Sequence, residues 1–365
     1  MKKFISAVLV SAMMLTLLGS CQSGGGSSTA SESGTSSESS VSSSESSEES
    51  SEAPSESSEE ASSGAEKLGV EMNIAFLKGP TGLGALELMD ANDKGETAVD
   101  YNISLVASAD EIVSGIGSGE YDLAAAPTNL GSTLYNKTSG GVSIVAINTL
   151  GVLYVLEKGD VAVSTVEDLR GMDIIASGEG STAEYVLDYI LSENGIDPET
   201  DVNITYYTEH AEAATVLASA ENAVAVLPQP FVTTVMNQDE GVSIALDLTD
   251  EWEKVTDGAQ LVMGSIIGRN EYIEANPEAV SAFLDEYAAS TDFVNNSVEE
   301  AAALSESYDL FPAAVASKAI PNCNIVFMEG EEMKTSAESF LQVMYDYEPS
   351  TVGGTLPGDD FYFAR

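Results

Sequence analysis

Histidine, cysteine and tryptophan are nearly missing from this sequence, which has one histidine, two cysteines and one tryptophan in 365 residues. A single histidine, His210, leaves little material for a metal cluster or for histidine-based catalysis. If Cys21 is acylated, Cys323 has no partner and no intrachain disulfide forms. A lone Cys323 is more often a small buried residue than a reactive thiol. The fold is therefore expected to be stable through its hydrophobic cores alone.

Basic residues are also scarce, because 13 lysines and arginines stand against 60 aspartates and glutamates. Ten of the acids precede residue 71, and the remaining 50 share residues 71–365 with ten basic residues. A surface this negative repels phosphate backbones and anionic lipid headgroups. The composition argues against a nucleic-acid partner and against direct adhesion to a membrane surface.

The N-terminus has the pattern of an export signal. Lys2 and Lys3 precede an apolar run over residues 4–18, which is too short to span a membrane as a helix. Gly19 and Ser20 then lead to Cys21, as in a lipobox. We expect a signal peptide over residues 1–20 and a diacylated Cys21 on the extracytoplasmic face of the cell membrane. The alternative is an ordinary signal peptide that happens to carry a cysteine.

Residues 21–69 consist almost entirely of serine, glutamate, glycine, threonine and alanine. Such a segment buries too little apolar surface to offset the entropy of ordering, so we expect a disordered tether. Its root-mean-square reach as a random coil is about 35–40 Å. A glycosylated serine-rich stalk is the rival interpretation and has the same mechanical consequence.

Short apolar strands alternate with helical stretches from residue 73 onward, which predicts an α/β fold of mostly parallel sheets flanked by helices. About 295 residues follow the tether, which is more than one core usually holds, so two lobes are expected. We place the first lobe at residues 70–148 plus 250–365 and the second at residues 149–249. The strands are expected at 73–78, 103–107, 121–126, 142–147, 151–156, 173–176, 202–206, 223–227, 242–246 and 261–267. The helices are expected from about 83 and at 109–116, 181–193, 211–218, 276–295 and 299–306.

Four loops of similar composition each end a strand with glycine or proline and then offer a small polar residue where a helix begins. They are residues 78–82, 126–129, 178–182 and 227–231. Free N–H groups at such places suit an anionic or carbonyl group on a ligand. Helix capping is the common alternative for any one loop, but two loops per lobe favour a shared cleft.

Sequence signatures of catalysis are missing. Residues 79–82 lack the Gly-Lys-Ser/Thr ending of a P-loop, and Gly178-x-Gly180 is a weak dinucleotide signal. No Gly-x-Ser-x-Gly turn occurs. His210, between Glu209 and Glu212, is expected at a solvated helix start. These features indicate a binding protein that is not an enzyme, with no catalytic residues, cofactor or metal.

The ensemble of motifs resembles the periplasmic-binding-protein type II fold, in the branch of ABC-importer receptors for nitrate, sulfonates, taurine and thiamine precursors. The residues that carry the resemblance are 79–82, 121–129, 134–138, Glu167-Asp168-Leu169-Arg170-Gly171, 178–185 and 226–231. The resemblance implies a monomer of two lobes that close on a small molecule about a two-strand hinge, expected at 147–155 and 247–264. The closed form would deliver the solute to an ABC permease with its cytoplasmic ATPase.

The resemblance also implies which residues bind ligand. In the cleft we expect Thr81, Gly82, Thr128, Asn129, Thr149, Ser181, Thr182, Gln229 and Phe231, with Lys78, Tyr154 and Trp252 as second choices. Lys78 would pair with a ligand anion or point into water, and Trp252 would stack on a flat ligand or pack in the core. Because Lys78 is the one basic residue in these loops, neutral or zwitterionic solutes such as a pyrimidine are as plausible as a sulfonate or a nitrate-like anion.

Two further hypotheses compete with an import receptor. One is an enzyme on the same fold, such as a pyrimidine-precursor synthase, although the histidine- or cysteine-rich cleft that would favour it is missing. The other is a ligand-sensing lipoprotein that signals to a membrane partner. The sequence assigns no role to residues 335–365, whose aromatic end is expected to pack against the first lobe.

Overall fold

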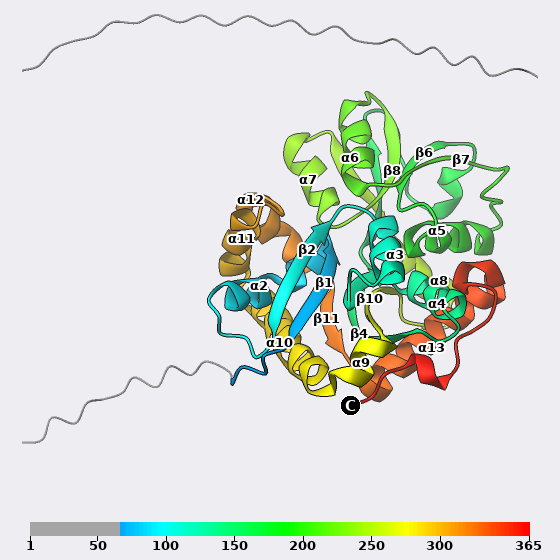
Figure 1. Cartoon of the computed structure of the whole chain (residues 1–365). Helices are drawn as coiled ribbons and strands as arrows, with labels where there is room; N and C mark the ends of the chain where they lie inside the picture. Colours follow the sequence, from blue (N-terminus) through cyan, green and yellow to red (C-terminus); the bar gives the residue numbers. More distant parts are fainter. Residues whose placement is uncertain (1–65) are drawn as a thin grey trace, which may run out of the picture. The chain divides into compact units, whose positions relative to one another are not determined.

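The computed structural model describes residues 66–365 of the chain (Figure 1). The expected signal peptide at 1–20, the acylation of Cys21 and all but the last residues of the 21–69 tether lie outside the described residues. Within the described part, no helix has the length and apolar character needed to cross a membrane. The same part of the chain holds no group of three or more metal-ligating side chains.

Two β-sheets organise residues 66–365, as the sequence predicted (Figure 1). The six-stranded sheet has the order β11-β4-β10-β3-β1-β2. Its strands are β1 Glu71–Leu77, β2 Asp100–Val106, β3 Leu123–Pro127, β4 Val142–Leu150, β10 Val262–Arg269 and β11 Ile325–Met328. The five-stranded sheet has the order β7-β6-β8-β5-β9. Its strands are β5 Leu153–Lys158, β6 Asp173–Ser177, β7 Asn203–Tyr207, β8 Ala223–Pro228 and β9 Val242–Asp247.

Helices cover both sheets. Near the six-stranded sheet lie α1 Pro80–Gly84, α2 Leu86–Asp93, α3 Ala109–Ser118, α4 Thr128–Lys137, α9 Asn270–Ala275, α10 Pro277–Asn296, α11 Val298–Ser307 and α12 Ala313–Ala319. Near the five-stranded sheet lie α5 Thr182–Glu193, α6 His210–Ser219, α7 Phe231–Gln238 and α8 Leu248–Val255. The long α13, Gly330–Tyr347, and the short 3₁₀ turns η1 Val166–Leu169, η2 Ile320–Asn322, η3 Pro349–Val352 and η4 Asp359–Phe361 complete the chain.

The sheets are mixed, which corrects the expectation of mostly parallel sheets. β1 pairs in parallel with β2 and β3, and β6 pairs in parallel with β7 and β8. β10 and β5, by contrast, run antiparallel to both of their neighbours, and β11 runs antiparallel to β4. A helical crossover within one sheet returns a strand in the same direction, but the chain enters both β5 and β10 from the other sheet. Strand–helix alternation therefore does not predict their direction.

Two connections join the sheets. Residues 151–152 carry the chain from β4 to β5, and α8 with residues 256–261 carries it from β9 to β10. Both lie inside the segments that the sequence assigned to the hinge. Asp247 caps α8 by accepting a hydrogen bond from the Thr249 backbone N–H at 2.8 Å, which fixes where the second connection leaves the sheet.

The C-terminal segment packs back onto the fold. The Phe361 ring lies edge-on to Tyr135 of α4 at 5.3 Å between centroids, and the Phe363 N–H donates to Ile144 of β4. The aromatic end therefore packs on elements of the six-stranded sheet, as expected from the sequence. Further upstream, α13 contributes Phe340 and Met344 to a core shared with α5 and α8.

A cavity between the two sheets

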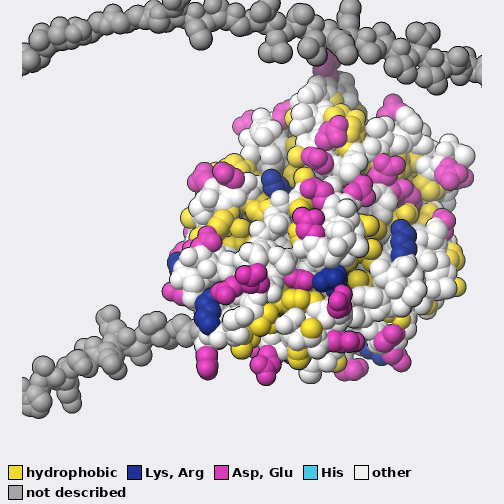
Figure 2. Space-filling model, in the orientation of Figure 1, with side chains coloured by type: hydrophobic (Ala, Val, Ile, Leu, Met, Phe, Trp, Pro, Cys, Tyr) yellow, Lys and Arg dark blue, Asp and Glu magenta, His cyan; other side chains and the backbone are white. Residues whose placement is uncertain are grey.

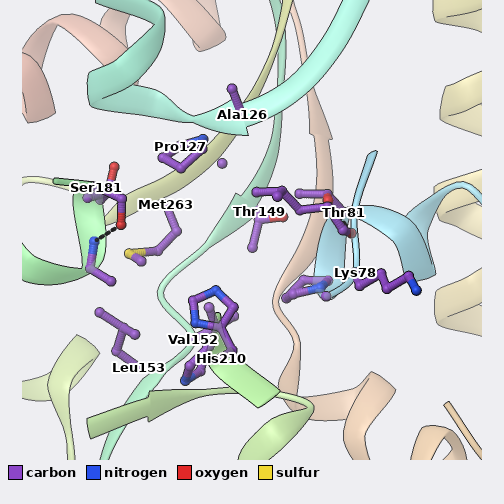
Figure 3. A pocket seen from close by; sticks show the side chains of 17 residues that line it. Lys78, Thr81, Ala126, Pro127, Thr149, Val152, Leu153, Ser181, His210 and Met263 are labelled. Carbon is purple, nitrogen blue, oxygen red and sulfur yellow. Dashed lines mark hydrogen bonds between the residues drawn. The ribbon is translucent and has the colours of Figure 1, made fainter. Parts of the chain in front are cut away.

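A cavity lies where the loops of the two sheets face each other (Figure 3). It encloses about 550 Å³ of empty space, part of it open to solvent. The six-stranded sheet contributes Leu77, Lys78, Gly79, Pro80, Thr81, Ala126, Pro127, Thr149, Met263 and Gly264. The five-stranded sheet and the first connection contribute Val152, Leu153, Ser181, Thr182, Ala183, His210 and Pro228. The wall is mostly aliphatic, and Lys78 is its one charged side chain.

Five of the expected ligand-binding residues line this cavity: Lys78, Thr81, Thr149, Ser181 and Thr182. They come from the ends of β1 and β4 and from the starts of α1 and α5. Lys78 is exposed, and in Figure 3 its side chain extends away from His210, Met263 and Ser181. In this structure the Lys78 ammonium is exposed, and its pairing with a ligand anion stays a prediction.

One expected residue, Asn129, links the two sheets instead of lining the cavity. Asn129 is buried at the start of α4, and its side-chain oxygen accepts a hydrogen bond from the Thr182 hydroxyl at 2.9 Å. Its amide nitrogen donates to the Thr351 carbonyl in the C-terminal segment at 3.1 Å. Thr182 therefore serves both the cavity wall and this contact between the lobes.

A second contact between the lobes lies near α7. The ring of Phe231 packs edge-on to Phe311, which follows α11, with 5.4 Å between centroids. Phe231 also lies 5.4 Å from the His210 ring. It does not line the cavity, and instead supports the histidine that does.

The other expected residues lie in the surrounding core. A β-carbon at Gly82 would come within 2.9 Å of the Leu77 carbonyl oxygen, so close packing explains this glycine. Thr128 shares a 2.7 Å hydrogen bond with Ser265. Gln229 accepts from the Thr233 hydroxyl at 2.8 Å. Burial raises the pKa of Tyr154 to about 12, which keeps its phenol neutral.

Trp252 is not among the residues that line the cavity. It is fully buried on α8 beside Tyr189 and Phe340, and its indole N–H donates to the Ala259 carbonyl at 2.7 Å. A packing role was the alternative stated from the sequence. The reason for it is that α8 presents its apolar face to α5 and α13, away from the cavity.

His210 is the site residue that the sequence analysis missed. It begins α6, as expected, but its ring lines the cavity beside Val152 and Leu153 (Figure 3). Its Nδ1 lies 2.7 Å from the Ser177 hydroxyl at the end of β6. Shielding by the surrounding protein lowers the pKa of the imidazole to about 4, so the ring is neutral at physiological pH. The acidic neighbours in sequence suggested solvent, and no local signal indicated the cover supplied by Phe231.

Comparison with known proteins fits this geometry. The profile of the NMT1-like family matches residues 93–307, more than half of the chain. A search of curated proteins found no match. An ABC transporter structure from Parabacteroides distasonis has 22% sequence identity and a TM-score of 0.67, covering 81% of this chain and 99% of that chain.

Two further solved structures have the same fold. The periplasmic aliphatic sulphonate binding protein of Escherichia coli is 17% identical with a TM-score of 0.64, covering 80% of this chain and 92% of that one. The periplasmic nitrate-binding protein of Synechocystis is 16% identical with a TM-score of 0.56, covering 76% and 82%. The periplasmic-binding-protein type II fold is thereby confirmed. Because the family profile matches residues 93–307, more than half of the chain, the chain belongs to the NMT1-like family.

Proposed function

We propose that this protein is an extracytoplasmic solute-binding lipoprotein of an ABC importer. The observation that carries the proposal is the cavity between two sheets that are joined by only two connections. A cavity with apolar walls and a few converging polar groups is typical of small-molecule sites. Solved structures of the same fold that are described as sulfonate-binding and nitrate-binding components support it.

In this proposal the lobes are residues 70–148 plus 250–365 and residues 149–249, and they close on the solute. The hydrogen bond between Asn129 and Thr182 and the contact between Phe231 and Phe311 hold the closed form. An ABC permease then recognises that form. The solute is released unchanged. Among the described residues at the cavity, the one hydroxyl paired with a base is that of Ser177 with His210, and we assign this neutral pair to the shape and polarity of the site.

A thermal-shift panel on the full-length protein tests solute binding. The panel contains sulfonates, nitrate, pyrimidines, amino acids and vitamin precursors. A ligand at about 100 times its Kd adds roughly 2.7 kcal/mol to the free energy of unfolding, so Tm rises saturably with the right class. Mass spectrometry of the recovered solute should show no conversion, since turnover would favour an enzyme instead.

Two methionine variants place the binding in the cavity. Met263 lines the cavity, and Met263→Trp should fill part of it and abolish the ligand-dependent shift. Met236 lies on the surface of α7, with 37% of its area exposed, and Met236→Trp should leave the shift unchanged. Equal loss in both variants, or in neither, would contradict the placement.

Lipidation of Cys21 is tested separately. In the native host, Cys21→Ala should move the protein from the membrane fraction to the soluble fraction and remove the mass of the acyl chains. Cys323→Ala is the matched control, since that thiol is fully buried in the fold and should leave fractionation unchanged. Membrane retention of Cys21→Ala would contradict the anchor but not solute binding.

A further inference from the structure

The hydroxyl groups in the cavity have already used their hydrogens. Thr81 donates to the Leu77 carbonyl at 3.0 Å, and Ser181 donates to the Gly178 carbonyl at 2.5 Å. Thr149 donates to the side chain of Asn148 at 3.3 Å. A hydroxyl has one donor hydrogen and two acceptor sites, so what remains in each group is acceptor capacity.

Thr182 completes this pattern, because its hydroxyl donates to Asn129 at 2.9 Å across the cleft. Ser181 also accepts from the Ala183 N–H and Thr182 from the Asn129 N–H at 3.5 Å, so each of the four hydroxyl groups offers a solute acceptor capacity and no free hydrogen. An anion needs donors to replace its hydration, and an unpaired anion in a mostly apolar cavity is costly. The wall favours a solute that brings its own N–H or O–H groups.

Among the helix starts that border the cavity, the start of α5 is already hydrogen-bonded to side chains of the protein. The Gly180 N–H donates to the Glu184 carboxylate, and the Ala183 N–H donates to the Ser181 hydroxyl at 3.3 Å. From the sequence we expected the loop at residues 178–182 to offer free N–H groups to an anionic or carbonyl group. In the structure a carboxylate of the chain already takes that place, so a second negative group there would meet like charge.

Acidic residues also lie beside the cavity. A second cavity of about 660 Å³ adjoins the first and shares Leu77, Pro127, Ser181 and His210 with it. Its wall includes Asp110 and Glu179 and no basic residue. Figure 2 shows the same excess on the visible face, where acidic side chains are widespread and basic ones are few. An anion approaching the cavity meets an unfavourable potential, and a cation a favourable one.

Lys78, the one charged side chain of the wall, is exposed and extends away from His210, Met263 and Ser181 (Figure 3). Among the polar side chains near those residues, His210 is one that can adapt. Its Nδ1 faces Ser177, and its other ring nitrogen donates or accepts according to the tautomer. Because the ring is neutral, it adds no positive charge for an anion. It supplies at most one neutral donor.

We propose that the cavity binds a compact solute without an anionic group, neutral or singly cationic, whose N–H or O–H groups meet the hydroxyls of Thr81, Thr149, Ser181 and Thr182. This inference rests on the proposed function and selects among its solute classes, favouring an amino- or hydroxyl-bearing ring over a sulfonate or nitrate. Aliphatic residues such as Leu153 and Met263 would cover the apolar part of the ring.

Three probes of one ring and different charge test the inference: benzylammonium, benzyl alcohol and benzenesulfonate. Their binding to the full-length protein is measured by calorimetry at low ionic strength. We expect benzylammonium and benzyl alcohol to bind at least about tenfold more tightly than benzenesulfonate, because the anion lacks donors and faces like charges. In the double variant Asp110→Asn and Glu179→Gln, the affinity for benzylammonium should fall by about two- to fivefold, while the affinity for benzyl alcohol should stay unchanged.

Each outcome separates the inference from the proposed function. Benzenesulfonate binding as tightly as the other two probes, in a way that Met263→Trp abolishes, would overturn the inference and leave solute binding intact. Failure of all three probes, together with a thermal-shift panel that also shows no binding, would count against the proposed function itself. If the double variant lost affinity for benzyl alcohol and benzylammonium equally, the electrostatic part of the inference would be overturned, because only the affinity for the charged probe should respond.

Discussion

At the scale of single residues, His210 combines a position in the cavity wall with an imidazole that stays neutral to low pH. Its pKa falls from an ordinary 6.5 to about 4 because burial disfavours the charged ring. The unfolded chain takes up the proton first as pH falls, so the stabilising contribution is complete above pH 6.5 and is lost between 6.5 and about 4.

The prediction at this scale compares the wild type with His210→Asn, which keeps a neutral polar group near Ser177. Between about pH 7 and pH 4.5 the wild type should lose about 1–2 kcal/mol more of its free energy of unfolding than the variant. Urea denaturation at both pH values measures the difference. Parallel pH profiles for the two proteins would show that the histidine is not held neutral by the fold.

At the scale of elements, α4 and α5 belong to different sheets and meet through Asn129 and Thr182. Thr182→Val keeps the shape but leaves the buried Asn129 oxygen without its donor, which costs about 1–2 kcal/mol in the closed form. The equilibrium between the closed and open forms should therefore shift by roughly 5- to 30-fold toward the open form. Hydrogen exchange at the starts of α4 and α5 should accelerate accordingly.

Thr233→Val is the matched control for that prediction. Its hydroxyl donates to Gln229 at 2.8 Å within one lobe, so the variant should lose stability without faster exchange at the start of α4. Faster exchange at α4 in both variants would indicate general destabilisation instead of lobe opening.

The elements also show where sequence reasoning stops. The α/β alternation predicted β1, α3, β6, α5 and β8 well, because each is set by its own apolar pattern and ends at a glycine or proline. β11 was missed because Ile325–Met328 is short and forms a strand through its pairing with β4, which is far away in the sequence. The sequence predicted the four loops that border the cavity. Which of their side chains face it depends on packing against distant segments, which the loop sequences do not indicate. Phe231 and Gln229 point into the core for that reason.

At the scale of the whole molecule, residues 71–365 carry 50 acidic and ten basic residues. The described basic groups are largely used in surface ion pairs, such as Lys67 with Asp100 and Arg365 with Asp285. Such pairs contribute little each, so the self-repulsion of the remaining carboxylates is the larger effect. Lowering that repulsion should stabilise the fold.

The prediction for the whole molecule is a Tm that increases with ionic strength. Between about 20 mM and about 300 mM sodium chloride, screening should raise the free energy of unfolding by on the order of 1 kcal/mol, which corresponds to about 2–4 °C in Tm. Differential scanning calorimetry measures the change, and potassium chloride at equal ionic strength should match it. A Tm that is constant or falls with salt would mean that the charges are already balanced by local pairs.

Trp252 has a consequence for optical measurements on this protein. It is the single tryptophan of the chain, it is fully buried, and it lies 5.2 Å from Tyr189 of α5 and 5.6 Å from Phe340 of α13 between ring centroids. The chain thus contains one indole fluorophore, located on α8 in a connection between the sheets and outside the cavity wall. Selective excitation of this indole reports rearrangement of α5, α8 and α13 without a dye, and in the proposed function a solute in the cavity should alter its emission through lobe movement and not through direct quenching.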